Sequence, residues 1–205
     1  MKIVLTFTEP LLGTAPMDKE IYSTYIAENR VTNGVGEFPH DEVDTIGEDK
    51  GKTGFHRDAA GNPILYDYVI KGFFKDTCGM LARVDGTGSK KLRAYKKIID
   101  GLVFVFPRQI PITVCGEIGA LERPLRAQTA QGERVALACS EMIAAGSSIA
   151  FTLDVLDSKV VTPELLEEWL DYGKYRGLGQ WRNASYGRFS YMHSKGDAMP
   201  RTAKA

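Results

Sequence analysis

Residues 173–189, near the carboxyl end of the chain, place four glycines and three arginines among tyrosine, tryptophan and phenylalanine. The preceding residues 162–170 begin with Thr162 and Pro163, carry acids early and repeat apolar residues at helical spacing, which predicts a helix. Residues 187–191 alternate as a strand does. The glycine-rich segment therefore joins a helix to a strand, whereas the glycine motifs of Rossmann folds and P-loops join a strand to a helix. This order excludes both of those nucleotide-binding folds.

The composition is that of a protein with a buried core. The chain has 205 residues, 43% of them hydrophobic and 10% aromatic, which suits a single domain. Basic and acidic residues both number 26, so binding to nucleic acid would have to come from local clusters of charge. Three widely spaced cysteines, no signal sequence and no apolar run of membrane-spanning length predict a reduced, cytoplasmic protein without membrane contact.

Hydrophobic spacing along the chain predicts the remaining elements. Strands are expected at residues 2–8, 101–107, 110–114, 135–140 and 143–155, and a hairpin at residues 55–65 with its turn at 60–62. The apolar run at 101–107 indicates burial on both faces. Helices are expected at residues 18–29, 68–83, 90–99 and 162–170.

Three polar segments lack such spacing. Residues 33–52 are glycine-rich and acidic, which predicts a mobile insertion, and residues 123–134 are polar and basic, which predicts a long loop or a hairpin tip. Residues 194–205 are predicted to be a disordered tail. The whole order is that of one α+β domain over residues 1–193, with a ferredoxin-like (RRM-like) antiparallel sheet, helices on one face and a glycine-rich loop before the last strand.

Three segments then resemble a known family. They are residues 10–13 after the first strand, residues 61–75 with Gly-Asn-Pro-Ile-Leu and Ile-Lys-Gly-Phe-Phe-Lys, and the terminal loop with Gly177, Gly179, Gly187 and Arg188. Residues 144–151 add a weaker match to a Gly-Thr-x-Phe strand entry. Together they make the chain similar to the RAMP superfamily, the ferredoxin-like RNA-binding proteins that build the backbones of CRISPR effector complexes.

The resemblance is incomplete in one loop. Where that family has Pro-Gly-Ser-Ser before its Lys-Gly, residues 65–69 here are Leu-Tyr-Asp-Tyr-Val. The chain also resembles a family of small uncharacterised phage and prophage proteins that share Ile-Lys-Gly-Phe-Phe-Lys and Gly-Leu-Gly-Gln-Trp-Arg-Asn. That second resemblance implies a mobile-element origin and no particular activity.

The residues themselves point to nucleic acid. Lys71 and Lys75 lie about one turn apart on a predicted helix, and they are expected to meet the glycine-rich loop because both helices of a ferredoxin-like fold pack on the same sheet face. Arginines fork onto phosphates, and aromatic rings stack on bases. The predicted nucleic-acid-binding residues are Lys71, Lys75, Arg126, Tyr175, Arg176, Gly177, Gly179, Trp181, Arg182 and Arg188.

The same features also allow a structural interpretation. Gly173 would then be a helix C-cap, Trp181 and Phe189 would be core residues, and the arginines would pair with the acids of the preceding helix, Glu164, Glu167 and Glu168. The basic run at residues 90–97 is better interpreted as the solvated face of a helix.

Catalysis has one weak candidate. The histidines are His40, His56 and His193, and only His56, beside Arg57 and Asp58, lies where a nuclease base would be plausible. No second acid or base is placed near it by spacing, and no ligand spacing of a metal site occurs. We predict no catalysis, no metal and no cofactor.

These observations favour a phage or prophage protein in the host cytoplasm that binds RNA or another nucleic acid. One alternative is an anti-defence protein that mimics or blocks a CRISPR-type complex through protein contacts. Others are a protein that captures a small signalling nucleotide and, as the enzymatic option, an endoribonuclease. The RAMP resemblance further implies a homo-oligomer.

Overall fold

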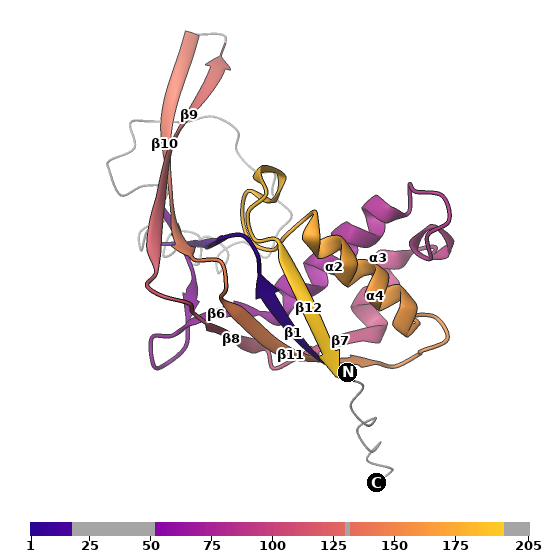
Figure 1. The fold of residues 1–205 in the computed structure, drawn as a ribbon. Coiled ribbons are helices and arrows are strands. Elements are labelled where there is room, and N and C mark those ends of the chain that lie inside the picture. The colour runs from indigo at the N-terminus through magenta and orange to yellow at the C-terminus, as the bar shows by residue number, and fades with distance from the viewer. Residues whose placement is uncertain (18–51, 130–131, 195–205) are drawn as a thin grey trace, which may run out of the picture.

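The computed structural model describes residues 1–17, 52–129 and 132–194. These residues form two β-sheets and three α-helices (Figure 1). The large sheet has the strand order β12-β1-β11-β8-β6-β5, with β7 also pairing with β11. Its strands are β1 (Lys2–Phe7), β5 (His56–Arg57), β6 (Pro63–Tyr66), β7 (Val103–Phe106), β8 (Gln109–Thr113), β11 (Ser148–Val155) and β12 (Phe189–Ser194).

The smaller sheet has the order β2-β10-β4-β3, with β9 pairing with the other edge of β10. Its strands are β2 (Leu11–Leu12), β3 (Ala15–Pro16), β4 (Lys52–Gly54), β9 (Gly119–Thr129) and β10 (Gly132–Ile143). The helices are α2 (Asp67–Leu81), α3 (Tyr95–Leu102) and α4 (Pro163–Asp171), and three short 3₁₀ turns are η1 (Ser89–Lys91), η2 (Tyr172–Lys174) and η3 (Arg182–Ala184). The mixed α and β prediction with antiparallel sheets is confirmed.

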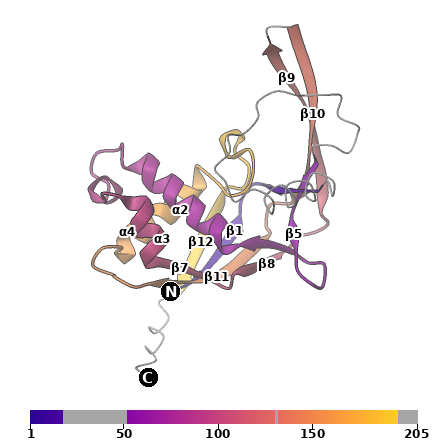
Figure 2. The same cartoon turned by 180° about the vertical axis from the view of Figure 1, so that it is seen from behind.

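The core lies between the large sheet and the three helices, which cover one face of that sheet (Figure 2). Alternation along β1 buries Ile3, Leu5 and Phe7, and the antiparallel pairing with β11 places Phe151 opposite Ile3 on the same face. Each such side chain contributes about 1.5–3 kcal/mol when fully buried. The predicted first strand is therefore confirmed, and its period of two is what fixes the buried face.

Helix α4 forms where its local signals predict it. The Thr162 hydroxyl accepts a hydrogen bond from the backbone N–H of Leu165 at 3.3 Å, and Pro163 occupies the first helical position. Trp169 is fully buried, with its indole N–H donating to Ser89 Oγ at 2.9 Å. This bond ties α4 to Ser89, in the connection between α2 and α3.

The helix predicted at residues 90–99 is wrong in its extent. The chain forms η1, leaves helical geometry at Leu92, and starts α3 only at Tyr95. Ala94 before it has a left-handed backbone with φ of 52°. Hydrophobic spacing alone does not detect such a break, because Leu92 and Ile99 remain at helical intervals across it.

The prediction that the strand at 101–107 is buried on both faces is also wrong. Val103 and Val105 are buried, but Phe106 is 53% exposed. The helices cover one face of the large sheet, so the alternate residues of β7 point to the other side.

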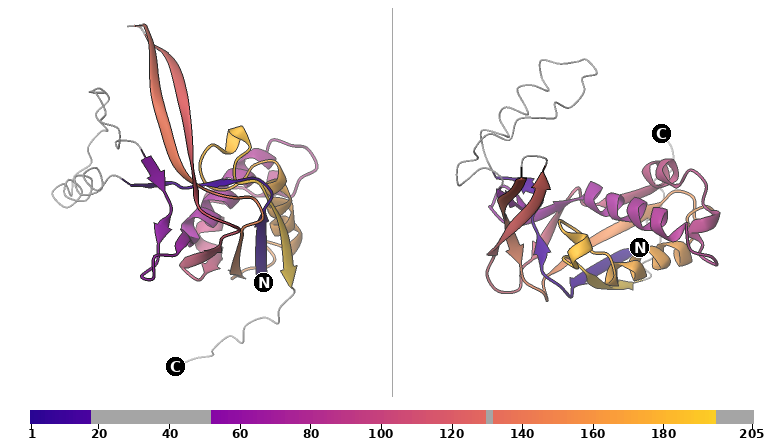
Figure 3. Two further views of the ribbon diagram at one scale, coloured as in Figure 1. Left: turned by 60° about the vertical axis from the view of Figure 1, so that its left-hand side comes forward. Right: turned by 90° about the horizontal axis from the view of Figure 1, so that it is seen from above.

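For residues 123–134 the hairpin-tip alternative is right and the long-loop alternative is wrong. Antiparallel pairing runs from Gly119 with Met142 to Thr129 with Gly132, so β9 and β10 form a long two-stranded hairpin. The hairpin projects from the body of the molecule (Figures 1 and 3). Its polar composition was misleading because an isolated ribbon exposes both of its faces to water.

Three predictions lie wholly or mainly outside the described residues. They are the helix at 18–29, the acidic insertion at 33–52 and the tail at 194–205. At their borders, Lys52 begins β4 and Ser194 ends β12.

Candidate nucleic-acid interface

The glycine loop, defined as residues 173–189, closes on itself through backbone contacts. The N–H of Leu178 donates to the carbonyl of Gly187 at 3.0 Å, and the N–H of Gly187 donates to the carbonyl of Pro10 at 2.8 Å. A methyl group on Gly177 would lie 2.0 Å from the carbonyl carbon of Gly187. Glycine is therefore required here for close backbone packing, and the crossing fixes the shape of the loop between its two ends.

The outer part of the loop holds two residues in a strained backbone conformation. Trp181 and Ser185 have φ of 52° and 75°, on either side of η3. A left-handed backbone costs a residue with a side chain roughly 1–2 kcal/mol. The strain holds the half-buried indole of Trp181 at the loop surface, with the Tyr186 ring edge-on at 6.1 Å. Strain of this kind is concentrated at binding and catalytic sites.

Two of the predicted arginines converge on one acid of α2. The Nε of Arg176 and the Nη1 of Arg182 both bond Asp76 Oδ2, the second at 3.1 Å. Arg176 also donates from Nη1 to the amide oxygen of Asn183 at 2.9 Å. The acid that partners these arginines is thus Asp76, not the glutamates of α4 considered from the sequence. One carboxylate between two guanidinium groups leaves one positive charge and fixes both planar groups.

These side chains surround an open hollow of about 430 Å³, which we call the arginine hollow. It is lined by Arg176, Gly179, Trp181, Arg182, Asn183 and Ala184. Gly179, with φ of +77°, leaves room beside the carbonyl oxygen of Leu12, which a methyl group would approach to 2.6 Å. The hollow therefore combines guanidinium donors, an aromatic surface and an amide side chain, the groups that suit a phosphate and a stacked base.

The hairpin contributes a residue to the same place. The guanidinium of Arg123, on β9, lies 5.9 Å from the centre of the Trp181 ring. The loop, coloured gold, stands between the hairpin and the helices in Figure 1. Arg126, the residue predicted from the sequence, is three positions further along β9, so it points to the opposite face of the ribbon, where its cross-strand partner is Val135. The loop and the hairpin therefore meet through Arg123, and not through the predicted Arg126.

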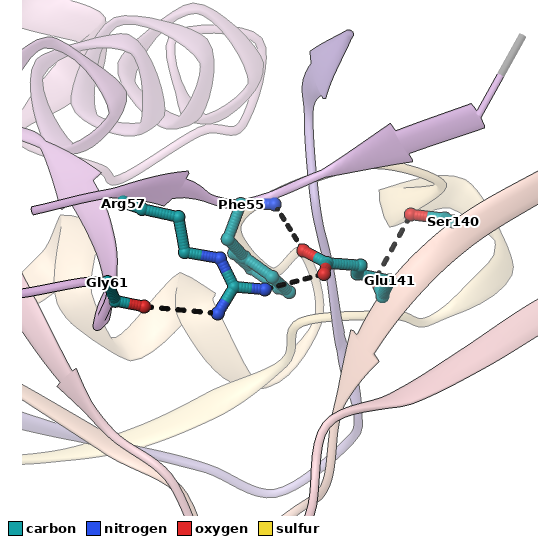
Figure 4. A network of polar contacts seen from close by, with 5 residues as sticks. All are labelled: Phe55, Arg57, Gly61, Ser140 and Glu141. Carbon is teal, nitrogen blue, oxygen red and sulfur yellow. Dashed lines mark hydrogen bonds and ion pairs between the residues drawn. The ribbon is translucent and has the colours of Figure 1, made fainter. Parts of the chain in front are cut away.

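The base of the hairpin is tied to the body by Glu141 of β10 (Figure 4). Its carboxylate accepts from the backbone N–H of Phe55 at 2.9 Å and pairs with Arg57 at 2.5 Å. Ser140, the neighbouring residue, donates to the carbonyl of Gly13 at 3.2 Å. These bonds fix the direction in which the hairpin leaves the sheet, and so they support the position of Arg123.

Two predicted residues of the loop lie at its ends. Arg188 donates from Nε to the backbone carbonyl of Tyr175 at 3.1 Å, and Tyr175 is 61% exposed with Lys174 5.1 Å from its ring centre. Phe189 is buried, and a methyl group on Gly173 would lie 2.2 Å from its ring. The core interpretation is therefore right for Phe189 and wrong for Trp181, and Gly173 is a packing glycine within η2.

Lys71 and Lys75 are not brought to the arginine hollow. Lys75 pairs with the Asp100 carboxylate of α3 at 2.5 Å, and Lys71 donates to the Asp100 carbonyl at 3.3 Å and lies 4.7 Å from the Phe104 ring centre. The two lysines share one stripe of α2, and Asp76 is about 100° further around the helix. The expectation that these lysines meet the loop is therefore wrong, because they face α3.

His56 lies in the β5 to β6 hairpin and packs edge-on against Tyr66, with ring centroids 4.9 Å apart. The nearby Asp58 accepts from the side chain and the backbone of Asn62 and from the backbone of Ala60, and these bonds lower the pKa of its carboxyl group. Asp58 thus acts as the acceptor that closes the hairpin turn.

Residues 1–17, 52–129 and 132–194 contain no cluster of three or more metal-binding side chains. Within the same ranges, no helix has the length and apolar character needed to cross a membrane.

Comparison with known proteins found similarity in structure and none in sequence. No protein-family model and no curated protein sequence matches this chain. One similar structure is a chain of the type III-B Cmr-beta complex bound to cognate target RNA, studied by cryo-EM, with a TM-score of 0.54 and 12% identity over 94% of this chain and 58% of that one. A second is a chain of a type IV-B CRISPR complex, with a TM-score of 0.50 and 11% identity over 98% of this chain and 94% of that one.

These likenesses establish the fold. Almost the whole chain shares the architecture of subunits from two kinds of CRISPR complex, at identities too low to transfer an activity. This chain spans 58% of the length of the first neighbour. The resemblance to proteins of CRISPR complexes is therefore confirmed at the level of fold.

Proposed function

We propose that this protein binds nucleic acid, with RNA favoured over DNA, and does so without catalysis. The observation that carries the proposal is the arginine hollow, which Arg176, Arg182 and the strained Trp181 line, with Arg123 lying over the Trp181 ring. A strand would place a phosphate against the guanidinium groups and stack a base on the indole.

The charge arrangement supports a nucleic-acid ligand. Asp76 holds Arg176 and Arg182 in place, so less side-chain entropy is lost when a phosphate binds. Arg182 retains donors beyond the one used on Asp76, because a guanidinium has five. Lys71, Lys75 and Arg126 lie outside the hollow and would add only long-range attraction.

The fold supports the same proposal. We interpret the element order β1, α2, β8, β11, α4, β12, with the strands arranged β12-β1-β11-β8, as a ferredoxin-like unit to which the hairpin and β5 to β6 are added. One structural neighbour is a subunit of a complex bound to target RNA. We keep as predictions that residues 1–193 form one domain, that the protein is encoded by a phage or prophage, and that it is cytoplasmic.

The test is fluorescence-anisotropy titration of nucleic-acid-free protein with single-stranded RNA and DNA. We expect Arg182→Ala and Trp181→Ala each to weaken RNA binding, the second by about 5- to 150-fold if one stacked base contributes 1–3 kcal/mol. Arg108→Ala removes an exposed arginine elsewhere and serves as the control.

The result decides between classes of function. Binding that both hollow variants lose and the control retains supports the proposal. Absence of RNA and DNA binding by the unaltered protein at low salt would overturn it, and a pull-down with CRISPR-type complexes would then test the anti-defence alternative. Binding of a dinucleotide or cyclic nucleotide alone would favour the signalling-nucleotide alternative.

A further inference from the structure

A second basic region lies just beyond the carboxyl end of α2. The segment 83–97 contains six basic residues and one acid, a local charge of +5 in a chain whose net charge is zero. All six basic side chains are exposed. We call this region the basic corner, and its members are Arg83, Lys90, Lys91, Arg93, Lys96 and Lys97.

The basic corner is not the solvated face of one helix. Its residues lie on the turn after α2, on η1, on the turn before α3 and on the first turn of α3. Lys90 pairs with Asp85. Among the described residues, no carboxylate lies within ion-pair distance of the other five members. Their charges are therefore available to an anionic partner.

The backbone beneath these charges is firmly held. Glu168 of α4 accepts from the backbone N–H of Gly88 at 2.7 Å, from that of Ser89 at 3.1 Å and from the Ser89 hydroxyl at 2.6 Å. The Thr87 hydroxyl donates to the carbonyl of Leu81 at 2.8 Å. Solvating a set of lysines would need no such anchoring, whereas a rigid loop presents its charges at little entropic cost.

The placement of the charges is unfavourable for folding alone. Lys96 and Lys97 occupy the first turn of α3, which contains no acid. A helix favours acids in its first turn and disfavours cations there. An arrangement that breaks a local rule without a compensating contact is expected where a ligand supplies the compensation.

The position of the corner relates it to the arginine hollow. Arg83 lies in the turn two residues after α2 ends at Leu81, and the helix rises by about 7.5 Å from Asp76 to that end. Asp76 pairs with Arg176 and Arg182 of the hollow, and Arg83 belongs to the corner. One extended strand can therefore reach from the hollow along α2 to the corner.

We propose that the basic corner is a second binding surface, which contacts the sugar–phosphate backbone of the strand whose base lies in the arginine hollow. The corner provides flexible point charges and no exposed aromatic ring in its segment, so it would bind phosphates without selecting bases. This inference rests on the proposed function and extends it. The hollow makes the base contact, and the corner provides the salt-dependent attraction to phosphates.

The test compares two charge-matched triple variants. The corner variant is Arg93→Ala, Lys96→Ala and Lys97→Ala, and the control is Lys2→Ala, Arg108→Ala and Lys159→Ala, which removes three exposed charges elsewhere. Each is titrated over a salt series with an RNA of about 30 nucleotides and one of about four, the smaller end of single-strand sites. Thermal melts confirm that both variants are folded.

For the long RNA, we expect the corner variant to bind about tenfold more weakly and its log-affinity against log-salt slope to fall by about 2, since each lost phosphate contact contributes about 0.7. The short RNA should bind both variants like the unaltered protein. Equal losses in both triple variants, or no loss in either, would overturn the inference.

The failure of either proposal has its own signature. If Arg182→Ala and Trp181→Ala lose binding while the corner variant binds both RNAs normally, the hollow stands and the corner is excluded. If the corner variant alone loses the long RNA, the corner stands and the hollow is excluded. If the unaltered protein binds neither RNA, both proposals fail.

Discussion

The arginine hollow and the basic corner hold their positive charges in opposite ways. In the hollow, Arg176 and Arg182 are half-buried and share Asp76, so their planes are fixed and part of their charge is neutralised. In the corner, Lys91, Arg93 and their neighbours are exposed on a rigid loop. Paired, positioned guanidinium groups favour geometric discrimination, whereas exposed charges favour attraction that salt weakens. The difference teaches that charge count alone does not identify the specific part of an interface.

The largest expected effect comes from breaking the shape of the glycine loop. Gly177→Ala places a methyl group 2.0 Å from the Gly187 carbonyl carbon, which we expect to destabilise the fold by about 3 kcal/mol and to abolish binding in the hollow. Urea denaturation measures the loss.

A matched control is Gly72→Ala. Its added methyl group meets no atom within 4 Å on α2, and we expect it to stabilise the helix by about 0.5–1 kcal/mol. An unchanged unfolding midpoint for Gly177→Ala would show that the backbone crossing does not determine the loop.

A smaller effect separates the two faces of the hairpin. Arg123→Ala removes the cation over Trp181, and we expect it to weaken RNA binding by about 1 kcal/mol, or roughly fivefold. Arg126→Ala removes the same charge from the opposite face and should change only the salt dependence. Equal losses of short-RNA affinity in the two variants would contradict this assignment.

The smallest effect concerns the stability of the basic corner. Lys96→Glu places an acid in the first turn of α3, and we expect it to stabilise the protein by about 0.3–1 kcal/mol while it weakens binding of long RNA. Lys159→Glu makes the same charge change away from that helix and should leave the melting temperature nearly unchanged. A lower melting temperature for Lys96→Glu would show that the lysine is a structural residue.

Much of the fold followed from local patterns. Alternation identified β1, and the Thr162 cap with Pro163 identified α4, because both signals act within a few residues. The break at Ala94 was missed, since a single left-handed residue leaves the apolar spacing intact. β10 was predicted only in part, over residues 135–140, and β9 was not predicted as a strand, because the polar outer part of the ribbon lacks the alternation of a half-buried strand.

The site was only partly visible in the sequence. The glycines, arginines and Trp181 of the loop were identified, but two residues that contact the side chains of the hollow, Asp76 and Arg123, were not among the predicted site residues. Asp76 lies in mid-helix about 100 residues before its partners, and the sequence near it contains no signal of that contact. Arg123 stood beside Arg126 in the sequence, and strand alternation would have separated them once the segment was known to be a strand.

By itself, the sequence determined the helices and strands with clear periodicity, the loop that joins α4 to β12, and the residue types available there. Those properties depend on neighbours along the chain, so local physical chemistry is sufficient. Only the tertiary structure decided that Asp76 pairs the arginines, that Arg123 reaches Trp181 and that Lys71 and Lys75 face α3. Those contacts depend on how the helices pack on the sheet and on where the hairpin leaves it, which distant residues determine together.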